Sequence, residues 1–153
     1  MPSNLRSLVE GVGKQAGKIM KRQTALRGSL LAMRLAIFIV MLMWTLDKFI
    51  NPGHAGKIFE TFYFIAGLES TVLAGLAALE MIILLGFLLG AYKRFCYGAV
   101  LAFHTVSTLS SYKQYLTPFE GPHLLFFAAW PMLAGCLLLY LLRDDDIYLT
   151  LHK

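Results

Sequence analysis

Three titratable side chains interrupt long apolar stretches of this sequence and are the first candidates for chemistry. Glu80 lies within TVLAGLAALEMIILLGFLLGAY, Arg34 within LLAMRLAIFIVMLMWTL, and His104 within the run that begins at Phe95. A charge at membrane depth is costly unless it is paired or hydrated. If these apolar stretches cross a membrane as helices, with about 1.5 Å of rise per residue, Glu80 lies roughly 16 to 18 Å from either end of its helix and His104 roughly 15 Å from the inner end of its own. The two groups would therefore lie at a similar depth in the membrane.

Two interpretations of these residues are open. In the structural one, Arg34 and Glu80 form an ion pair between helices, and His104 bonds to a hydroxyl or a carbonyl group. In the functional one, the three residues form a polar pocket that binds a ligand or relays protons. Glu80 would then be the acid or base and His104 its hydrogen-bonding partner, because both groups can titrate when desolvated. Hydroxyls on the second half of the His104 helix would line the cavity: Thr105, Ser107, Thr108, Ser110 and Ser111.

A second polar group flanks the ends of the apolar stretches and could converge on the outer face. It consists of Asp47, His54, Glu69 and His123. Carboxylate and imidazole groups together suit a transition metal. The sequence has no ligand spacing such as HxxxH, so no metal site is assigned to these residues. A haem held by two histidines is not expected, because only His104 lies deep.

The elements that position these residues follow from composition. Of 153 residues, 58% are apolar and 15% are charged, whereas soluble proteins average about half apolar and about a quarter charged. We predict an all-α membrane protein, a bundle of four antiparallel transmembrane helices of about 20 residues each. The spans are expected at residues 29–50, 69–92, 95–112 and 123–142, which make up a membrane domain over residues 29–143. Pro131 should kink the last span.

The segments outside the spans have distinct expected roles. Residues 1–28 are basic, and residues 5–27 are predicted to form an amphipathic helix at the membrane interface, with a frayed cytoplasmic tail as the alternative. The apolar positions recur at spacings of three and four: Leu5, Leu8, Val9, Val12, Ala16, Ile19 and Met20. A short helix on the outer face is expected within residues 54–68, and residues 144–153 should form a cytoplasmic tail. Cys96 and Cys136 are expected to be free thiols.

Orientation follows from the distribution of Lys and Arg, which concentrate on the cytoplasmic side of membrane proteins. With the N-terminus inside, ten of these residues fall on inner segments: Arg6, Lys14, Lys18, Lys21, Arg22, Arg27, Lys93, Arg94, Arg143 and Lys153. Three fall on outer segments: Lys48, Lys57 and Lys113. The predicted location is the cell (inner or plasma) membrane, with both termini in the cytoplasm.

The chain resembles the DoxX-like family of small four-span membrane proteins. The resemblance covers residues 30 to about 143 and depends on MRLAIFIVMLMWTLDKF, on LEMIILLGFLLGAYKR and on the overall layout. It implies that Arg34, Asp47 and Glu80 are the positions to carry over. It also implies a link to quinone-coupled sulfur or thiol oxidation as a subunit, or a role in assembly. The basic N-terminal extension and the ending LLRDDDIYLTLHK depart from the family pattern.

Three functions compete at this point. The leading hypothesis is a subunit linked to quinone or thiol redox chemistry that binds a ligand or partner near Arg34, Glu80 and His104, with quinone as the candidate cofactor. The second is a non-enzymatic membrane scaffold or assembly factor, and the third is a transporter of small solutes or metals. An accessory subunit is favoured over a stand-alone enzyme, and the expected partners are the lipid bilayer and a membrane or periplasmic protein. Nucleic acid is not expected, because the net charge of +5 lies mostly in the first 29 residues and beside span ends.

Overall fold

The computed structural model describes the backbone of residues 3–151 and the side chains of residues 11–151. Every regular element in this part of the chain is a helix. The elements are α1 (Ser3–Ile50), α2 (Pro52–Tyr63), α3 (Ser70–Leu88), α4 (Lys93–Ser110), α5 (Tyr112–Leu116), the 3-10 segment η1 (His123–Ala128) and α6 (Ala129–Leu141).

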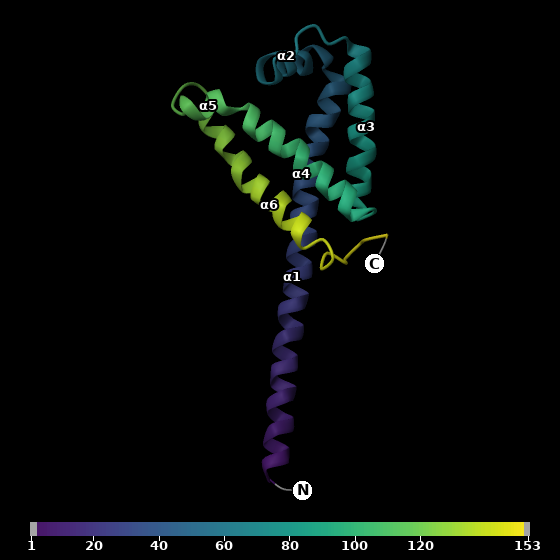
Figure 1. Ribbon diagram of the computed structural model, residues 1–153, viewed down its shortest axis with the longest axis vertical. Coiled ribbons are helices and arrows are strands. Elements are labelled where there is room, and N and C mark those ends of the chain that lie inside the picture. Colours follow the sequence, from purple (N-terminus) through teal and green to yellow (C-terminus); the bar gives the residue numbers. More distant parts are fainter. Residues whose placement is uncertain (1–2, 152–153) are drawn as a thin grey trace.

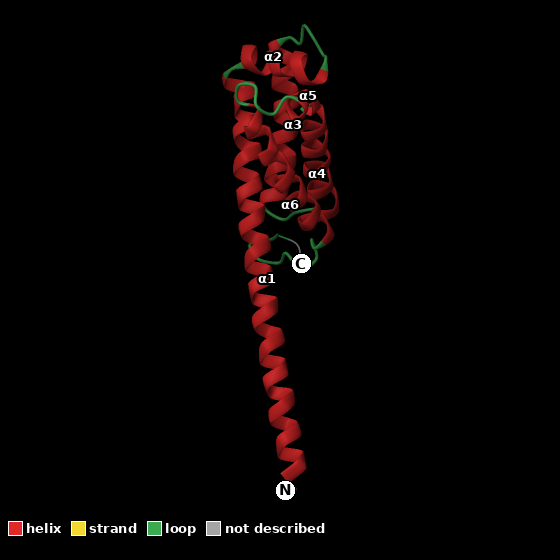
Figure 2. Cartoon of the chain, turned by 90° about the vertical axis from the view of Figure 1, so that its left-hand side faces the viewer, coloured by secondary structure: helices red, strands yellow, loops and turns green. Residues whose placement is uncertain are grey.

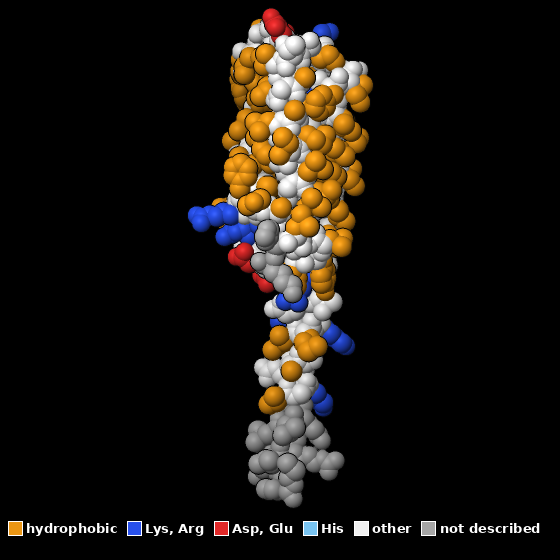
Figure 3. All heavy atoms as spheres, turned by 90° about the vertical axis from the view of Figure 1, so that its right-hand side faces the viewer, with side chains coloured by type: hydrophobic (Ala, Val, Ile, Leu, Met, Phe, Trp, Pro, Cys, Tyr) orange, Lys and Arg blue, Asp and Glu red, His pale blue; other side chains and the backbone are white. Residues whose placement is uncertain are grey.

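Three of the described stretches are long and apolar enough to cross a membrane. They are Gly11–Ile50 within α1, Ser70–Leu88, which is α3, and His123–Leu141, which joins η1 and α6. Only 17 to 28% of the positions in their most apolar windows are buried inside the protein. Apolar side chains therefore cover the outside of the helices, as Figure 3 shows for one side of the molecule. Such a surface is typical of a membrane protein and not of a water-soluble one.

The second half of α1 packs with α3, α4 and α6 in a ring. α1 contacts α3 and α6, and α4 contacts both α3 and α6 on the opposite side. Successive helices of the ring run in alternating directions (Figures 1 and 2). The ring encloses one apolar core: Leu30, Ile37, Met41, Ile83, Leu84, Phe87, Cys96, Tyr97, Val100, Cys136 and Leu139. Cys96 and Cys136 are buried free thiols, as expected.

A small residue allows α3 and α4 to approach closely. A Cβ atom on Gly86 would lie 2.6 Å from the Cys96 sulfur, so only glycine fits here without a shift. One residue further along α3, Phe87 meets Tyr97 of α4 edge to face, with ring centroids 4.8 Å apart. Small residues at helix contacts are typical of membrane bundles. This packing places the Tyr97 hydroxyl at the base of the ring.

The first half of α1 is a straight continuation of the helix that enters the ring, and it projects away from the bundle (Figure 1). Residues 11–25 are exposed, while Leu30 is buried. The predicted boundary at residue 28 is therefore no break in the helix, and the backbone is helical from Ser3 onward. The side chains of Leu5, Arg6, Leu8 and Val9, like Lys153, lie outside the described part of the chain.

Two predicted elements differ in detail from the observed ones. The outer helix, expected within residues 54–68, is α2 and begins at Pro52, because proline suits the first turn of a helix. It ends where Phe64 adopts a left-handed conformation with φ 59°. The last predicted span begins as a 3-10 helix and becomes α-helical at Ala129. Pro131 therefore lies in the first turn of α6, where its missing N–H breaks no α-helical bond.

Candidate functional site

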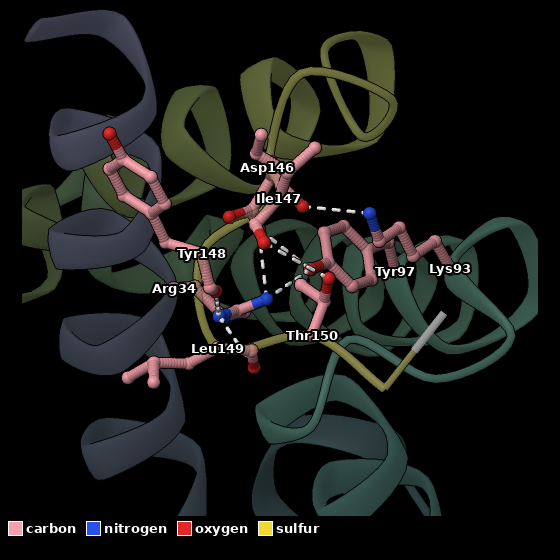
Figure 4. A network of polar contacts seen from close by, with 8 residues as sticks. All are labelled: Arg34, Lys93, Tyr97, Asp146, Ile147, Tyr148, Leu149 and Thr150. Atoms are coloured by element: carbon pink, nitrogen blue, oxygen red, sulfur yellow. Dashed lines mark hydrogen bonds and ion pairs between the residues drawn. The ribbon is translucent and has the colours of Figure 1, made fainter. Parts of the chain in front are cut away.

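Arg34 is a fully buried charge, with no exposed side-chain area. It points from α1 toward the base of the ring (Figure 4). One guanidinium nitrogen, Nη1, donates to the Tyr97 hydroxyl at 3.0 Å and lies 3.2 Å from Oδ2 of Asp146. The other, Nη2, donates to the carbonyls of Tyr148 and Leu149. The arginine is thus held mainly by residues from the end of the chain.

Asp146 is equally buried and binds residues of two helices, α1 and α4. Besides its ion pair with Arg34, its carboxylate accepts a hydrogen bond from the Tyr97 hydroxyl at 2.7 Å. Its backbone carbonyl accepts one from Nζ of Lys93 at 2.7 Å. We call this cluster of Arg34, Lys93, Tyr97 and Asp146 the tail latch. It ties α1, the start of α4 and the C-terminal segment into one contact (Figure 4).

The turn between α3 and α4 receives the tail. Gly90 there has φ +58°, a conformation that favours glycine. A Cβ atom at Gly90 would also meet the Thr150 side chain and lie 2.8 Å from Nη1 of Arg34. The amide of Leu151 donates to the carbonyl of Leu89 at 2.9 Å. Over residues 144–151, the segment predicted as a cytoplasmic tail therefore folds against the bundle.

The predicted ion pair between Arg34 and Glu80 is wrong. Glu80 pairs with Lys48, with Nζ and Oε2 2.7 Å apart, while Arg34 pairs with Asp146. Lys48 lies at the end of α1, and its side chain reaches back one turn, where it also donates to the Trp44 carbonyl at 3.2 Å. Helical side chains point toward the N-terminus, so this lysine can reach a glutamate below its own backbone level. The two side chains keep 15% and 14% of their area exposed.

His104 has its own partner on a different helix. Its ring nitrogen Nε2 lies 3.0 Å from the carbonyl of Ala129, and 8% of the residue is exposed. This contact is the one expected in the structural interpretation, in which the histidine bonds to a carbonyl. The three predicted pocket residues, Arg34, Glu80 and His104, thus each have a different partner. None of them bonds to another of the three.

The four residues predicted to converge on the outer face do so only in part. Asp47 and His54 meet, with Oδ2 and Nδ1 2.7 Å apart, and Asn51 also donates to Asp47 at 3.2 Å. His123 instead contacts the hydroxyl and carbonyl of Thr117, at 2.9 and 2.8 Å. Glu69 accepts a bond from the hydroxyl of Thr71, two residues away. Among the described residues, no three metal-ligating side chains come together.

Three members of the tail latch were not predicted as site residues: Lys93, Tyr97 and Asp146. One signal was available, because a buried arginine requires a carboxylate and the ending RDDDIYLTL places three carboxylates before an apolar run. An apolar run at this position can pack against the apolar surface of the bundle, and an aspartate just before it would then lie close to the bundle. Local spacing gave no reason to choose Asp146 over Glu80.

Comparisons of the chain with family models, with curated proteins and with solved structures found no match.

Proposed function

We propose that this chain is a non-enzymatic accessory subunit of the cell membrane that serves as a scaffold for a partner protein. One observation carries the proposal: Arg34, Glu80 and His104, the titratable groups that interrupt its apolar stretches, each have a partner within the protein. Arg34 is held by the tail, Glu80 by Lys48, and His104 by a carbonyl group. Groups used in this way hold helices together and have less capacity left for a substrate.

The proposed membrane arrangement has four antiparallel spans: the second half of α1, then α3, α4, and η1 with α6. The least apolar of these is α4, whose polar residues His104 and Thr108 are buried against neighbouring helices. Its large exposed apolar side chains suit lipid: Phe95, Phe103, Val106 and Leu109. A helix with this division can cross a membrane as part of a bundle.

The proposed orientation places both ends of the chain in the cytoplasm. Lys93, Asp146 and Arg34 meet at one end of the ring, and the projecting half of α1 extends from that same end (Figures 1 and 4). Basic side chains gather there and along the projecting helix (Figure 3). At the opposite end, Lys48 is turned inward to Glu80. This distribution supports the positive-inside assignment.

Cysteine labelling tests the orientation. Thr24→Cys and Glu120→Cys each place a thiol at an exposed position, while the two native cysteines are buried. In intact cells, a membrane-impermeant maleimide should label Glu120→Cys and leave Thr24→Cys unlabelled until the cells are opened. Labelling of Thr24→Cys in intact cells would contradict the orientation.

Replacement of Glu80 tests the scaffold role. Glu80→Gln should lower the melting temperature in detergent, because it removes the partner of a largely buried lysine, while proteins that copurify with the chain stay the same. Lys57→Gln, at an exposed lysine, is the matched control. A Glu80→Gln protein that melts normally but loses a membrane-linked activity would argue against a scaffold.

A quinone-linked role, as in a DoxX-like redox subunit, is the second candidate function. The observation that favours it is the partial exposure of the Lys48–Glu80 pair, which leaves a charged donor within reach of a ligand's carbonyl group. Decylubiquinone titrated into protein in nanodiscs, followed by the tryptophan fluorescence of the protein, distinguishes the two roles. The scaffold proposal expects no saturable change. Saturable binding that Lys48→Met abolishes would support the redox role instead.

A further inference from the structure

The projecting half of α1 carries a mostly apolar stripe, which is exposed from Val12 to Gln23. The stripe consists of Val12, Ala16, Ile19, the polar Gln23 and Leu26, at alternating spacings of four and three residues, and Leu26 packs at the edge of the core. Val12 and Ile19 are 67% and 54% exposed. Alternation of four and three is the spacing by which one helix packs along another.

The stripe continues a face of α1 that is already a helix interface. At the same spacing it runs on into Leu30, Met33 and Ile37, and Leu30 and Ile37 are buried in the core. Met33 and Ile37 lie against Gly135 of α6, where an added Cβ would be 3.2 and 3.4 Å from their side chains. α6 ends at Leu141, whereas the stripe continues for about four turns below the bundle. A second helix could therefore pack along the projecting half of α1, beyond the end of α6.

Charge restricts the kind of helix that fits. Residues 11–28 contain five basic side chains and no acidic one: Lys14, Lys18, Lys21, Arg22 and Arg27. If the stripe residues occupy positions a and d of a heptad repeat, Arg22 is at position g and Arg27 at position e. The two arginines therefore flank the stripe on opposite sides. Two copies of α1 in parallel would place Arg22 of one beside Arg27 of the other, and like charges there oppose pairing. Acidic flanking residues on a partner helix would be attracted.

We infer that residues 11–28 of α1 form a docking site for an amphipathic helix of another protein, with an apolar heptad stripe flanked by Asp and Glu. A protein is favoured over a lipid surface because α1 continues without a break into its bundle half, so its basic half points away from the bundle and does not turn across the base. The inference rests on the proposed function for one point only, that the partner is cytoplasmic.

The test uses the full chain in phosphatidylcholine nanodiscs and a synthetic fluorescent peptide of about four heptads. The peptide has Leu at heptad positions a and d and Glu at the flanking positions e and g. Fluorescence anisotropy should show saturable binding. Ile19→Gln should weaken this binding by about tenfold or more. Ala25→Gln, a change at another exposed position that is not part of the stripe, should leave the binding unchanged. None of these positions packs on the bundle, so each variant should fold normally.

Charge reversal provides a second measurement. Arg22→Glu combined with Arg27→Glu should abolish binding of the Glu-flanked peptide and create binding of a peptide with Lys at the same positions. Absence of saturable binding, or equal loss in Ile19→Gln and Ala25→Gln, would overturn the inference.

Two other occupants would also overturn it, and each has its own signature. A dimer in sedimentation that Ile19→Gln dissolves would mean that the stripe joins two copies of this chain. Protection of residues 11–28 from hydrogen exchange in phosphatidylglycerol nanodiscs without peptide would mean that the stripe lies on an anionic membrane. Cysteine labelling that contradicts the proposed orientation, together with normal peptide binding, would refute the cytoplasmic placement alone.

Discussion

Arg34 and Asp146 are a pair of buried opposite charges, and their energetics depend on the set being complete. Desolvation of the two ions opposes the pair, while the Tyr97 hydroxyl and the tail carbonyls supply the additional hydrogen bonds that such a pair needs. Loss of one ion leaves the other buried without compensation. The latch is therefore sensitive to single substitutions and tolerant of a matched apolar replacement.

Asp146→Asn should destabilise the protein by about 3 to 5 kcal/mol, the usual cost of removing one partner of a buried ion pair. Melting in detergent, followed by circular dichroism, measures the loss. Asp144→Asn, at an exposed aspartate two residues away, should leave the melting temperature unchanged. The double variant Arg34→Met with Asp146→Leu should recover most of the lost stability. Equal effects of Asp146→Asn and Asp144→Asn would show that the tail is not latched.

Lys48 and Glu80 should show energetic coupling, because they form a largely buried ion pair in which Nζ and Oε2 lie 2.7 Å apart. A double-mutant cycle of Lys48→Met and Glu80→Gln should give an interaction energy of about 0.5 to 3 kcal/mol. A cycle of Lys57→Met and Glu80→Gln should give a value near zero. Additive effects of the first pair would mean that the two charges act independently.

At the scale of elements, the turn between α3 and α4 positions the tail by leaving room for it. Gly90 provides both the left-handed backbone and the space next to Thr150 and Arg34. His104 and Thr108 of α4 are buried against its neighbours, while large apolar residues such as Phe95 and Val106 are exposed. The 18 residues of α4 begin with Lys93 and Arg94 and include His104, and α4 alone among the ring helices is not apolar enough to be identified as a membrane span by length and composition.

Gly90→Ala should displace the tail, since alanine is unfavourable at positive φ by about 1 to 2 kcal/mol and its Cβ would meet Thr150. The amide of Leu151, bonded to Leu89, should then exchange faster with deuterium. Gly75→Ala, in α3 with nothing within 4 Å of the added carbon, is the matched control. Unchanged exchange of Leu151 in Gly90→Ala would show that the turn does not hold the tail.

At the scale of the whole molecule, the bundle and the projecting half of α1 are energetically separate. The contacts of α1 with the ring begin near Leu26, which packs at the edge of the core. Every described side chain before it, from residue 11 to residue 25, is exposed. The projecting segment therefore contributes a surface and a charge distribution, while stability resides in the ring and the tail latch.

Deletion of residues 2–17 should therefore leave the melting temperature in detergent unchanged, since no described contact of the bundle is lost. The deletion retains Lys18, Lys21, Arg22 and Arg27, so the basic excess beside the first span persists. Deletion of residues 144–153, which removes Asp146, serves as the destabilising comparison. A large fall in melting temperature on the N-terminal deletion would mean that the segment packs on the bundle.

The sequence by itself determined the helical class, the apolar surface and the approximate bounds of the helices. These properties depend on local composition and on runs of about 20 apolar residues, which are readable without knowledge of the fold. The same local pattern predicted a carbonyl or hydroxyl partner for His104 as one of two interpretations. The relation to DoxX-like proteins, the orientation and the redox or scaffold role stay predictions.

The tertiary structure decided which charges meet. Arg34 and Tyr97 are 63 residues apart, and Arg34 and Tyr148 are 114 apart, so no local periodicity relates them. Several carboxylates were chemically equivalent partners for Arg34 in the sequence. The order of the helices in the ring and the return of the tail beneath it bring Asp146 to the arginine, whereas the inward reach of Lys48 occupies Glu80. Partner choice is a property of this packing, because electrostatic attraction alone does not distinguish one carboxylate from another.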